Sequence, residues 1–384
     1  MSDHGGITRV YVIKSFYNLG EEGIDQPMRH GKLLLFCLLL TLCLVSACVS
    51  GTRTSNTGEK KKKGPNDPVV IGFSMDTLKE ERWQRDKELV EKRGKEVGAT
   101  INVQVANGDD SLQIKQAENL LTQGVDVLIV APHNGEIAAS IVEAAKRQGV
   151  PVISYDRLIK NADVDLYVSH QVVKMGEMQA DYILKHAPKG NYVIVQGSET
   201  DNNAKLLHDG QMHILKPAVD RGDIKIVADQ PAKEWQQSAA LNIVENALTQ
   251  NNNNIVAVVA ANDGTARGAV QALEGQNLAG KVLVSGQDAD LPSLQLILQG
   301  KQTMTIYKPI QPLANAAVDS AIKLARGEKL ETTETIDNGF KKVPAILLEP
   351  VSVDKDNLVG TVVKDGYQTL DKICAGIQSD QCRK

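Results

Sequence analysis

The residues of this sequence best suited to binding chemistry are two tryptophans. Trp83 and Trp235 are the only Trp residues among 384, and each comes shortly after an apolar segment with the composition of a strand. Two flat indole faces suit a sugar ring, whose axial C–H faces are apolar and whose rim carries hydroxyl groups. Either Trp alone could equally pack within its own domain. The comparable placement of the pair favours contact with a ligand.

Charged and amide side chains stand close to the ends of the predicted strands. Asn262 comes shortly after the apolar run 255–260, and Asp288 comes shortly after 282–285. In open parallel sheets, ligands bind beyond the carboxyl ends of the strands. A single polar residue there could serve only a turn, but several of them predict a polar cleft. The candidate partners for sugar hydroxyl groups are Arg82, Asp156, Arg157, Asn203, Asn262, Asp288 and Lys308.

Sequence motifs for catalysis or cofactor binding are absent. The G-x-x-x-x-G-K pattern at 275–281 lacks the following Ser or Thr of a phosphate-binding loop, and it leads into a strand. His208 and His213 are five residues apart, which does not place two metal ligands on one helix face. We therefore predict a binding protein and not an enzyme, with no catalytic residue, metal site or cofactor.

The elements that must hold these side chains alternate between strand and helix. Apolar runs predict strands over residues 69–73, 101–106, 125–131, 150–155, 192–196, 224–228, 255–260 and 282–285. Amphipathic segments predict helices over 80–97, 111–122 (capped by Ser111) and 136–148, and near Asn203, Trp235, Gly264 and Leu291. Such alternation gives parallel sheets with helices on both faces. Because 125–156 and 255–288 follow similar patterns, we predict an α/β fold of two similar doubly wound parallel-sheet lobes.

The N-terminal region has the features of an export signal. A basic stretch at 28–32 precedes the apolar run 33–45, which is too short to span a bilayer comfortably. A buried core helix is the alternative, but the run has no polar face. We predict a signal peptide region over 1–47 and expect the true start of the protein at Met28.

The tetrapeptide V-S-A-C at 45–48 resembles a bacterial lipobox, in which the Cys is lipidated and becomes the first mature residue. We therefore expect Cys48 to carry a lipid and residues 48–68 to be a membrane tether. Cys374 and Cys382 are then the Cys residues of the folded part. The sequence allows two alternatives for them, a small disulfide loop or two free thiols.

Composition limits the class of partner. The chain has 43 Lys and Arg against 47 Asp and Glu, for a net charge of −4. A near-neutral balance argues against nucleic acid, which selects a basic face. Apolar residues at 42% and charged residues at 23% are typical of a globular protein.

Several short motifs together resemble one family. They are E-R-W-Q at 81–84, A-N-G at 106–108, Y-D-R at 155–157, D-N-N-A-K at 201–205, S-G-Q-D-A-D at 285–290, Q-T-M-T at 302–305 and Y-K-P at 307–309. Across about residues 69–370, the chain resembles the D-xylose-binding proteins of bacterial ABC importers, within the type I periplasmic binding protein family. The resemblance implies that Trp83 and Trp235 sandwich a pyranose and that the seven polar candidates bind its hydroxyl groups.

The resemblance also implies a domain arrangement and partners. The chain would cross between lobes three times, near 170, 306 and 344, as a three-segment hinge. The N-lobe would comprise 69–170 plus 307–343 and the C-lobe 171–306 plus 344–372, followed by a tail over 373–384. A monomer on the outer side of a membrane would deliver a monosaccharide, D-xylose, to the ABC permease.

Two positions depart from the family pattern. His170-Gln171-Val172 stands where relatives carry an Asp-Asn pair, and Leu207-His208 stands where an aromatic residue and an Arg are common. Both border the predicted cleft, so hinge geometry or sugar preference could differ. There are two alternatives to this function. The ligand could be a different pentose or hexose, or the closed form could be delivered to a chemosensor.

Overall fold

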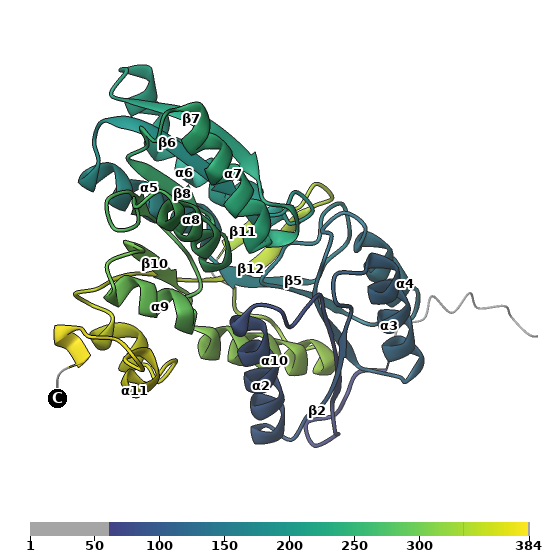
Figure 1. Cartoon of the computed structure of the whole chain (residues 1–384). Coiled ribbons are helices and arrows are strands. Elements are labelled where there is room, and N and C mark those ends of the chain that lie inside the picture. The colour runs from purple at the N-terminus through teal and green to yellow at the C-terminus, as the bar shows by residue number, and fades with distance from the viewer. Residues whose placement is uncertain (1–60, 333, 383–384) are drawn as a thin grey trace, which may run out of the picture. The chain divides into compact units, whose positions relative to one another are not determined.

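Strands and helices alternate along the chain, as predicted, and the strands form two main sheets (Figure 1). The structure is a computed structural model that describes residues 61–332 and 334–382. The predicted signal peptide, lipidation site and most of the tether lie outside the described residues. Among the described residues, no helix is both long and apolar enough to cross a membrane. All of the described residues belong to one compact unit.

The larger sheet has seven strands in the order β11-β12-β5-β4-β3-β1-β2. All neighbouring strands run parallel except β11 and β12, which are antiparallel. The strands are β1 (Val70–Met75), β2 (Thr100–Val105), β3 (Val127–Ala131), β4 (Val152–Tyr155), β5 (Leu166–His170), β11 (Glu334–Asp337) and β12 (Lys342–Leu348). We call this sheet with its helices the first lobe.

Helices cover both faces of the larger sheet, so its central strand β3, with the sequence V-L-I-V-A, is apolar and buried throughout. In β3, Ile129 packs with one cluster, whereas Leu128 and Val130 pack with the other. Alternate residues of a strand point to opposite faces, which explains this division. The first face is covered by α2 (Glu81–Glu96) and α10 (Ile310–Arg326), and the second by α3 (Asp110–Thr122) and α4 (Ala139–Arg147).

The smaller sheet repeats this arrangement with four parallel strands in the order β7-β6-β8-β9. They are β6 (Gly190–Gln196), β7 (Ile224–Pro231), β8 (Ala257–Ala260) and β9 (Leu283–Val284). One face packs against α5 (Val172–His186) and α6 (Asn202–Asp220), the other against α7 (Gln237–Gln250) and α8 (Asp263–Gly275). We call this sheet with its helices the second lobe, and the prediction of two similar α/β lobes is confirmed.

The C-terminal segment forms a third cluster. It contains β10 (Met304–Tyr307) paired antiparallel with β13 (Val351–Asp354), then α9 (Leu291–Leu298) and α11 (Leu370–Ile373). Short 3-10 segments at Lys233–Trp235 and Asp380–Cys382 and a π-helical turn at Val359–Val363 complete the described elements. A disulfide joins Cys374 to Cys382, so of the two alternatives the structure has the small disulfide loop.

Two local expectations differ from the structure. Helix α3 is capped by Asp109 and not by Ser111, because the Asp109 carboxylate accepts a hydrogen bond from Leu112 N at 2.9 Å. Strand β12 pairs with β5 as far as Leu348, so the first lobe's sheet extends beyond 343, where the N-lobe was predicted to end. The other domain boundaries stay predictions.

Helices α5 and α6 approach each other closely at two glycines. A Cβ added to Gly176 would lie 2.0 Å from Leu207 O, and one added to Gly210 would lie 2.0 Å from Val173 O. Because backbone carbonyls occupy the space of a side chain, only glycine allows this separation. The close approach brings α6, which begins at Asn202 beside the cleft, against the helix that leaves the first lobe.

We predict that Gly176→Ala lowers the free energy of unfolding by about 1–3 kcal/mol, the usual cost of overpacking a dense contact. The matched control is Gly275→Ala at the end of α8, where an added Cβ meets nothing within 4 Å. The control should leave stability unchanged or raise it by up to about 1 kcal/mol. Urea unfolding of both variants tests this, and equal stabilities would contradict the account of the helix contact.

Candidate functional site

The nine predicted binding residues come together between the two lobes. All nine line one cavity, which we call the inner cavity, together with Glu80, Asp201 and Gln287. The strand ends supply Asp156 and Arg157 after β4 and Lys308 after β10, and Asn262 caps α8. The sequence analysis therefore correctly predicted that these nine side chains lie close to one another. The three additional residues each lie next to, or within two positions of, a predicted one.

A buried cluster of charges occupies the first-lobe side of the inner cavity. Arg82 Nη1 donates to Asp156 Oδ2 at 2.5 Å, and Arg82 Nε and Nη2 both donate to Asp86 Oδ2, at 2.9 and 2.8 Å. Tyr155 Oη donates to the other Asp86 oxygen at 2.5 Å. Arg82 and Asp156 are only 3% exposed and Asp86 is fully buried. Burial of charges is tolerated only when they are paired in this way.

Two cationic side chains stabilise the ionised form of Asp156. Lys308 Nζ lies 3.8 Å from Asp156 Oδ2 and 2.9 Å from Asp288 Oδ1. Burial alone would raise the pKa of Asp156, but the charges of Arg82 and then Lys308 outweigh it and hold that pKa well below its ordinary value. Asp156 is therefore an ionised acceptor at neutral pH.

Arg157 forms ion pairs with carboxylates of both lobes. It donates from Nη1 to Asp76 Oδ2 at 2.7 Å in the first lobe, and its Nε lies 2.8 Å from Asp201 Oδ2 in the second. The guanidinium groups of Arg82 and Arg157 lie 4.1 and 5.1 Å from the centre of the Trp83 ring. These cation–π contacts fix the orientation of that indole within the cavity.

Trp235 enters the cavity from the second lobe. It follows Glu234 in a short 3-10 segment in which both residues have positive φ, 54° and 56°. Its ring lies so close to Gly197 that an added Cβ would be 2.1 Å from the ring edge. Its Nε1 is buried and has no hydrogen-bond partner among the described residues. The indole is therefore held by shape rather than by a polar contact.

Backbone strain gathers at the site. Asp156 and Asp288 have φ of 60° and 103°, a region in which residues other than glycine are uncommon. Together with Trp235, three of the nine predicted residues adopt it. Such conformations persist where the surroundings determine them and are concentrated at functional sites.

Asp263 was missed by the sequence reasoning although it directly follows Asn262 at a strand end. It is fully buried and accepts hydrogen bonds from Gln302 Nε2 at 2.9 Å, Thr305 Oγ1 at 2.9 Å and Asp290 N at 3.0 Å. Burial, and then the neighbouring carboxylates, raise the pKa of Asp263. The bond from Asp290 N, together with the bond from Asp263 N to Gln287 O at 2.9 Å, holds the loop that carries Asp288.

The two positions that depart from the family pattern have partners of their own. His170 is buried at the end of β5, and its Nε2 lies 3.3 Å from Pro309 O. Burial, and then the charge of Lys308, lower the pKa of His170 to about 3, so the imidazole is neutral. His208 lies 2.9 Å from Asp229 at the edge of the second lobe, and it does not line the inner cavity.

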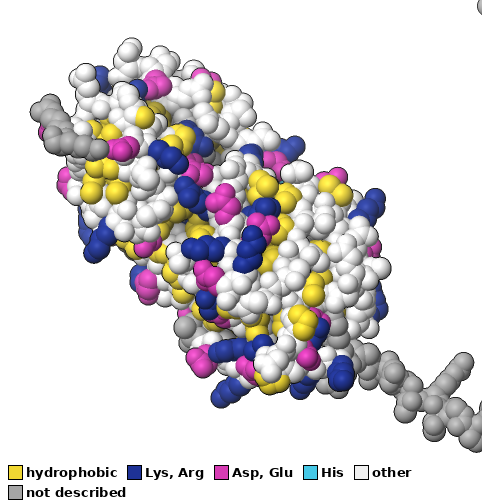
Figure 2. Space-filling view, turned by 90° about the horizontal axis from the view of Figure 1, so that it is seen from below, with side chains coloured by type: hydrophobic (Ala, Val, Ile, Leu, Met, Phe, Trp, Pro, Cys, Tyr) yellow, Lys and Arg dark blue, Asp and Glu magenta, His cyan; other side chains and the backbone are white. Residues whose placement is uncertain are grey.

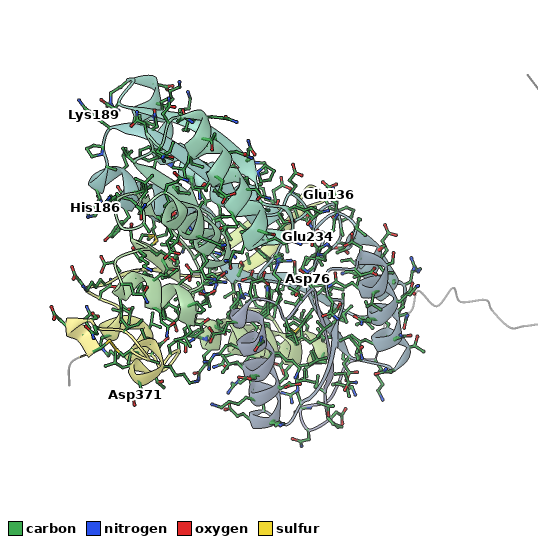
Figure 3. The ribbon with its side chains drawn as sticks, viewed as in Figure 1. Asp76, Glu136, His186, Lys189, Glu234 and Asp371 are labelled. Carbon is green, nitrogen blue, oxygen red and sulfur yellow. A yellow bond between two sulfur atoms is a disulfide. The ribbon has the colours of Figure 1, made fainter. Side chains whose placement is uncertain are left out.

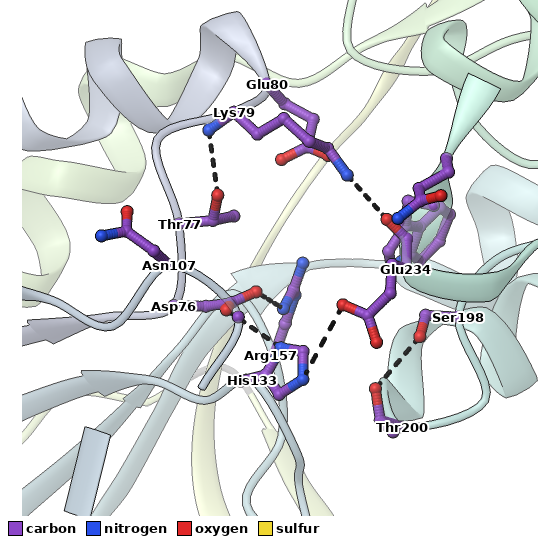
Figure 4. Close-up of a pocket in the computed structure, with 13 residues that line it drawn as sticks. Asp76, Thr77, Lys79, Glu80, Asn107, His133, Arg157, Ser198, Thr200 and Glu234 are labelled. Carbon is purple, nitrogen blue, oxygen red and sulfur yellow. Dashed lines mark hydrogen bonds and ion pairs between the residues drawn. The ribbon is translucent and has the colours of Figure 1, made fainter. Parts of the chain in front are cut away.

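A second cavity adjoins the inner one, and we call it the outer cavity (Figure 4). It measures about 180 Å³ and shares Glu80, Arg157 and Trp235 with the inner cavity. The inner cavity is smaller and measures about 30 Å³. Within the part of the chain that the structure describes, no group of three or more His, Cys, Asp or Glu side chains could hold a metal ion.

A family model described as a periplasmic binding protein domain matches residues 71–329. This chain belongs to the periplasmic binding protein family. The D-xylose-binding periplasmic protein of Haemophilus influenzae is 50% identical over 305 residues, which cover 79% of this chain and 92% of that protein. The D-xylose-binding periplasmic protein of Escherichia coli is 47% identical over 330 residues, covering 86% and 97%.

A solved structure gives the same fold. The carbohydrate transporter solute binding protein from Chloroflexus aurantiacus, in complex with D-glucose, has a TM-score of 0.76 and 30% identity, and the match covers 80% of this chain and 98% of that one. The predicted type I periplasmic binding protein fold is confirmed, and the family is one of binding proteins rather than enzymes.

His133 bridges the lobes of this periplasmic binding protein at the outer cavity. Its Nδ1 lies 3.0 Å from Asp76 Oδ1 in the first lobe, and its Nε2 lies 3.9 Å from Glu234 Oε2 in the second. Asp76 and Glu234 are neighbours in Figure 3 although they come from different lobes. The hydrogen bond to Asp76 outweighs burial and raises the pKa of His133 above its ordinary 6.5.

Because this pKa is raised in the folded state, protonated His133 stabilises the fold. We predict that the wild type melts higher than His133→Gln below about pH 6.5, and that this advantage disappears as the pH rises through the folded pKa. Thermal unfolding at several pH values measures it. His186→Gln, at an exposed position on α5 (Figure 3), is the control. An advantage that grows with pH would contradict the prediction.

Proposed function

We propose that this chain captures D-xylose between its lobes and delivers it to an ABC permease. The observation that carries the proposal is the inner cavity, where two indoles and seven hydrogen-bonding side chains from both lobes converge. The relatives with 50% and 47% identity are D-xylose-binding proteins. No step of this function requires a bond to be made or broken.

The proposed pose places the pyranose between Trp83 and Trp235. The indole faces cover the apolar faces of the ring, and the paired charges at its rim meet the hydroxyl groups. Asp156 and Asp288 accept hydrogen bonds, whereas Arg82, Arg157 and Lys308 donate them. Asn203 Nδ2 already donates to Asp156 O at 3.1 Å, but its buried Oδ1 has no partner in the described chain. That oxygen is a free acceptor for a hydroxyl group.

Binding would require the lobes to separate. An inner cavity of about 30 Å³ is too small for a pyranose, so a sugar enters only when Trp235 and its lobe move away from Trp83. Sugar that contacts both lobes then favours the closed form by its differential affinity for that form. Closure removes water from the hydrogen bonds and strengthens them. A permease could then recognise the closed arrangement of the two lobes.

The location proposed for this protein is the outer side of a bacterial membrane. The support is the signal-like run at 33–45 and the lipobox-like residues ending at Cys48, which would leave a lipid-anchored monomer near its permease. Figure 2 shows Lys and Arg interspersed with Asp and Glu on the face in view, with no uniformly basic patch there. That distribution suits an uncharged ligand better than nucleic acid.

Calorimetric titration of residues 57–384, which form one unit, tests the ligand directly. We predict that D-xylose binds and that Trp235→Ala weakens it at least about 30-fold, because a buried aromatic at a binding centre contributes about 2 kcal/mol or more. Asp288→Asn should weaken binding about 10-fold or more, because it removes a charge-assisted hydrogen bond.

The control is Asp356→Asn, at an exposed position in the C-terminal segment, which should bind as the wild type does. The fluorescence of the two Trp residues supplies a second readout, because both line the inner cavity. Binding of D-glucose but not D-xylose would retain the site and change the sugar. If none of D-xylose, D-glucose, D-ribose and arabinose bound, the inner cavity would not be a sugar site.

A further inference from the structure

The outer cavity is a direct continuation of the proposed sugar site. Arg157 and Trp235 line both cavities, so a ring between the two indoles would have one edge facing the outer cavity. The outer cavity has about six times the volume of the inner one, about 180 against 30 Å³. It is closed on both sides by different lobes, with Asp76 at the end of β1 and Thr200 just before α6.

The lining of the outer cavity suits an uncharged hydroxyl-rich group. Its charged side chains are largely paired with each other: Asp76 with Arg157 at 2.7 Å and with His133 at 3.0 Å. Neutral donors and acceptors fill the remaining wall, including Asn107 and the hydroxyls of Ser198 and Thr200, which lie 3.0 Å apart (Figure 4). Paired charges disfavour an ionic ligand, because a new charge would compete with existing partners.

The wall also has an apolar part. The indole of Trp235 borders the cavity, and Gly108 borders it without a side chain. Both cavities therefore combine an aromatic edge with amide groups, and the outer one adds the hydroxyls of Ser198 and Thr200. The volume of the outer cavity is about 180 Å³. This space suits one further sugar ring and does not suit a long chain.

We propose that the outer cavity is a second sugar subsite, so that the chain also binds a disaccharide whose first ring occupies the inner cavity. The inference rests on the proposed function, because the first ring must be a sugar held between Trp83 and Trp235. The substrate class is an uncharged pentose disaccharide. Its second ring would hydrogen-bond to Asn107, Ser198 and Thr200.

The test compares D-xylose with xylobiose, its β-1,4-linked disaccharide, by calorimetry on residues 57–384. The wild type should bind both, and xylobiose should compete with D-xylose for one site. Thr200→Phe fills the outer cavity without altering a residue of the inner one. It should weaken xylobiose at least 10-fold and leave D-xylose within twofold.

The matched control is Glu199→Phe, which adds the same ring at the exposed neighbouring position and should change neither affinity. Ser198→Ala provides a second variant that removes a hydroxyl without filling space, and it should weaken xylobiose alone, about threefold or more. Circular dichroism of each variant confirms folding.

The outcomes separate the two proposals. Binding of D-xylose without xylobiose at millimolar concentration overturns the second subsite and keeps the proposed function. Equal effects of Thr200→Phe on both sugars also overturn the subsite. Binding of xylobiose alone supports the subsite and contradicts the monosaccharide function, and binding of neither overturns both.

Discussion

The ionised carboxylate of Asp156 is the group on which the rest of the site depends. Its oxygen accepts from Arg82 at 2.5 Å, and Lys308 approaches the same oxygen at 3.8 Å. A buried carboxylate without such partners would protonate or unfold the region. The backbone of Asp156 has a positive φ of 60°, a conformation that is unfavourable for a residue other than glycine and that places the carboxylate in the cluster. Arg82 is also paired with Asp86, and Lys308 is also paired with Asp288. The charge of Asp156 is therefore linked through ion pairs to residues from four segments of the chain.

The same cluster connects the two lobes. Asp156 belongs to the first lobe, and its carbonyl oxygen accepts from Asn203 Nδ2 of the second at 3.1 Å. Arg157, the next residue, connects Asp76 to Asp201 across the lobes. A polar ligand that inserts at this junction would replace contacts between lobes by contacts with itself. In the proposed function, lobe closure and ligand recognition therefore use the same atoms.

Local patterns in the sequence predicted most of the elements and the neighbouring positions of the site. Apolar runs are local signals, so the sequence predicted β1–β4 and β6–β9 with the polar residues that follow several of them, but it did not predict β5, β11 and β12 of the larger sheet. The pairing of β12 with β5 is not local, which is why the first lobe extends to Leu348 and not 343. Asp263 was not among the predicted binding residues because its role depends on Gln302 and Thr305, which lie 39 and 42 residues further along the chain. The neutral state of His170 likewise depends on its burial beside Lys308.

We propose that the closed arrangement opens to admit sugar and that the bound sugar then favours closure. Spin labels at the exposed positions Lys115, on α3 of the first lobe, and Glu245, on α7 of the second, report the distance between lobes. Pulsed dipolar spectroscopy should give a broad distance distribution that extends to longer values without sugar. With saturating D-xylose it should collapse to one short, narrow distance. An identical distribution with and without a bound sugar would contradict the account.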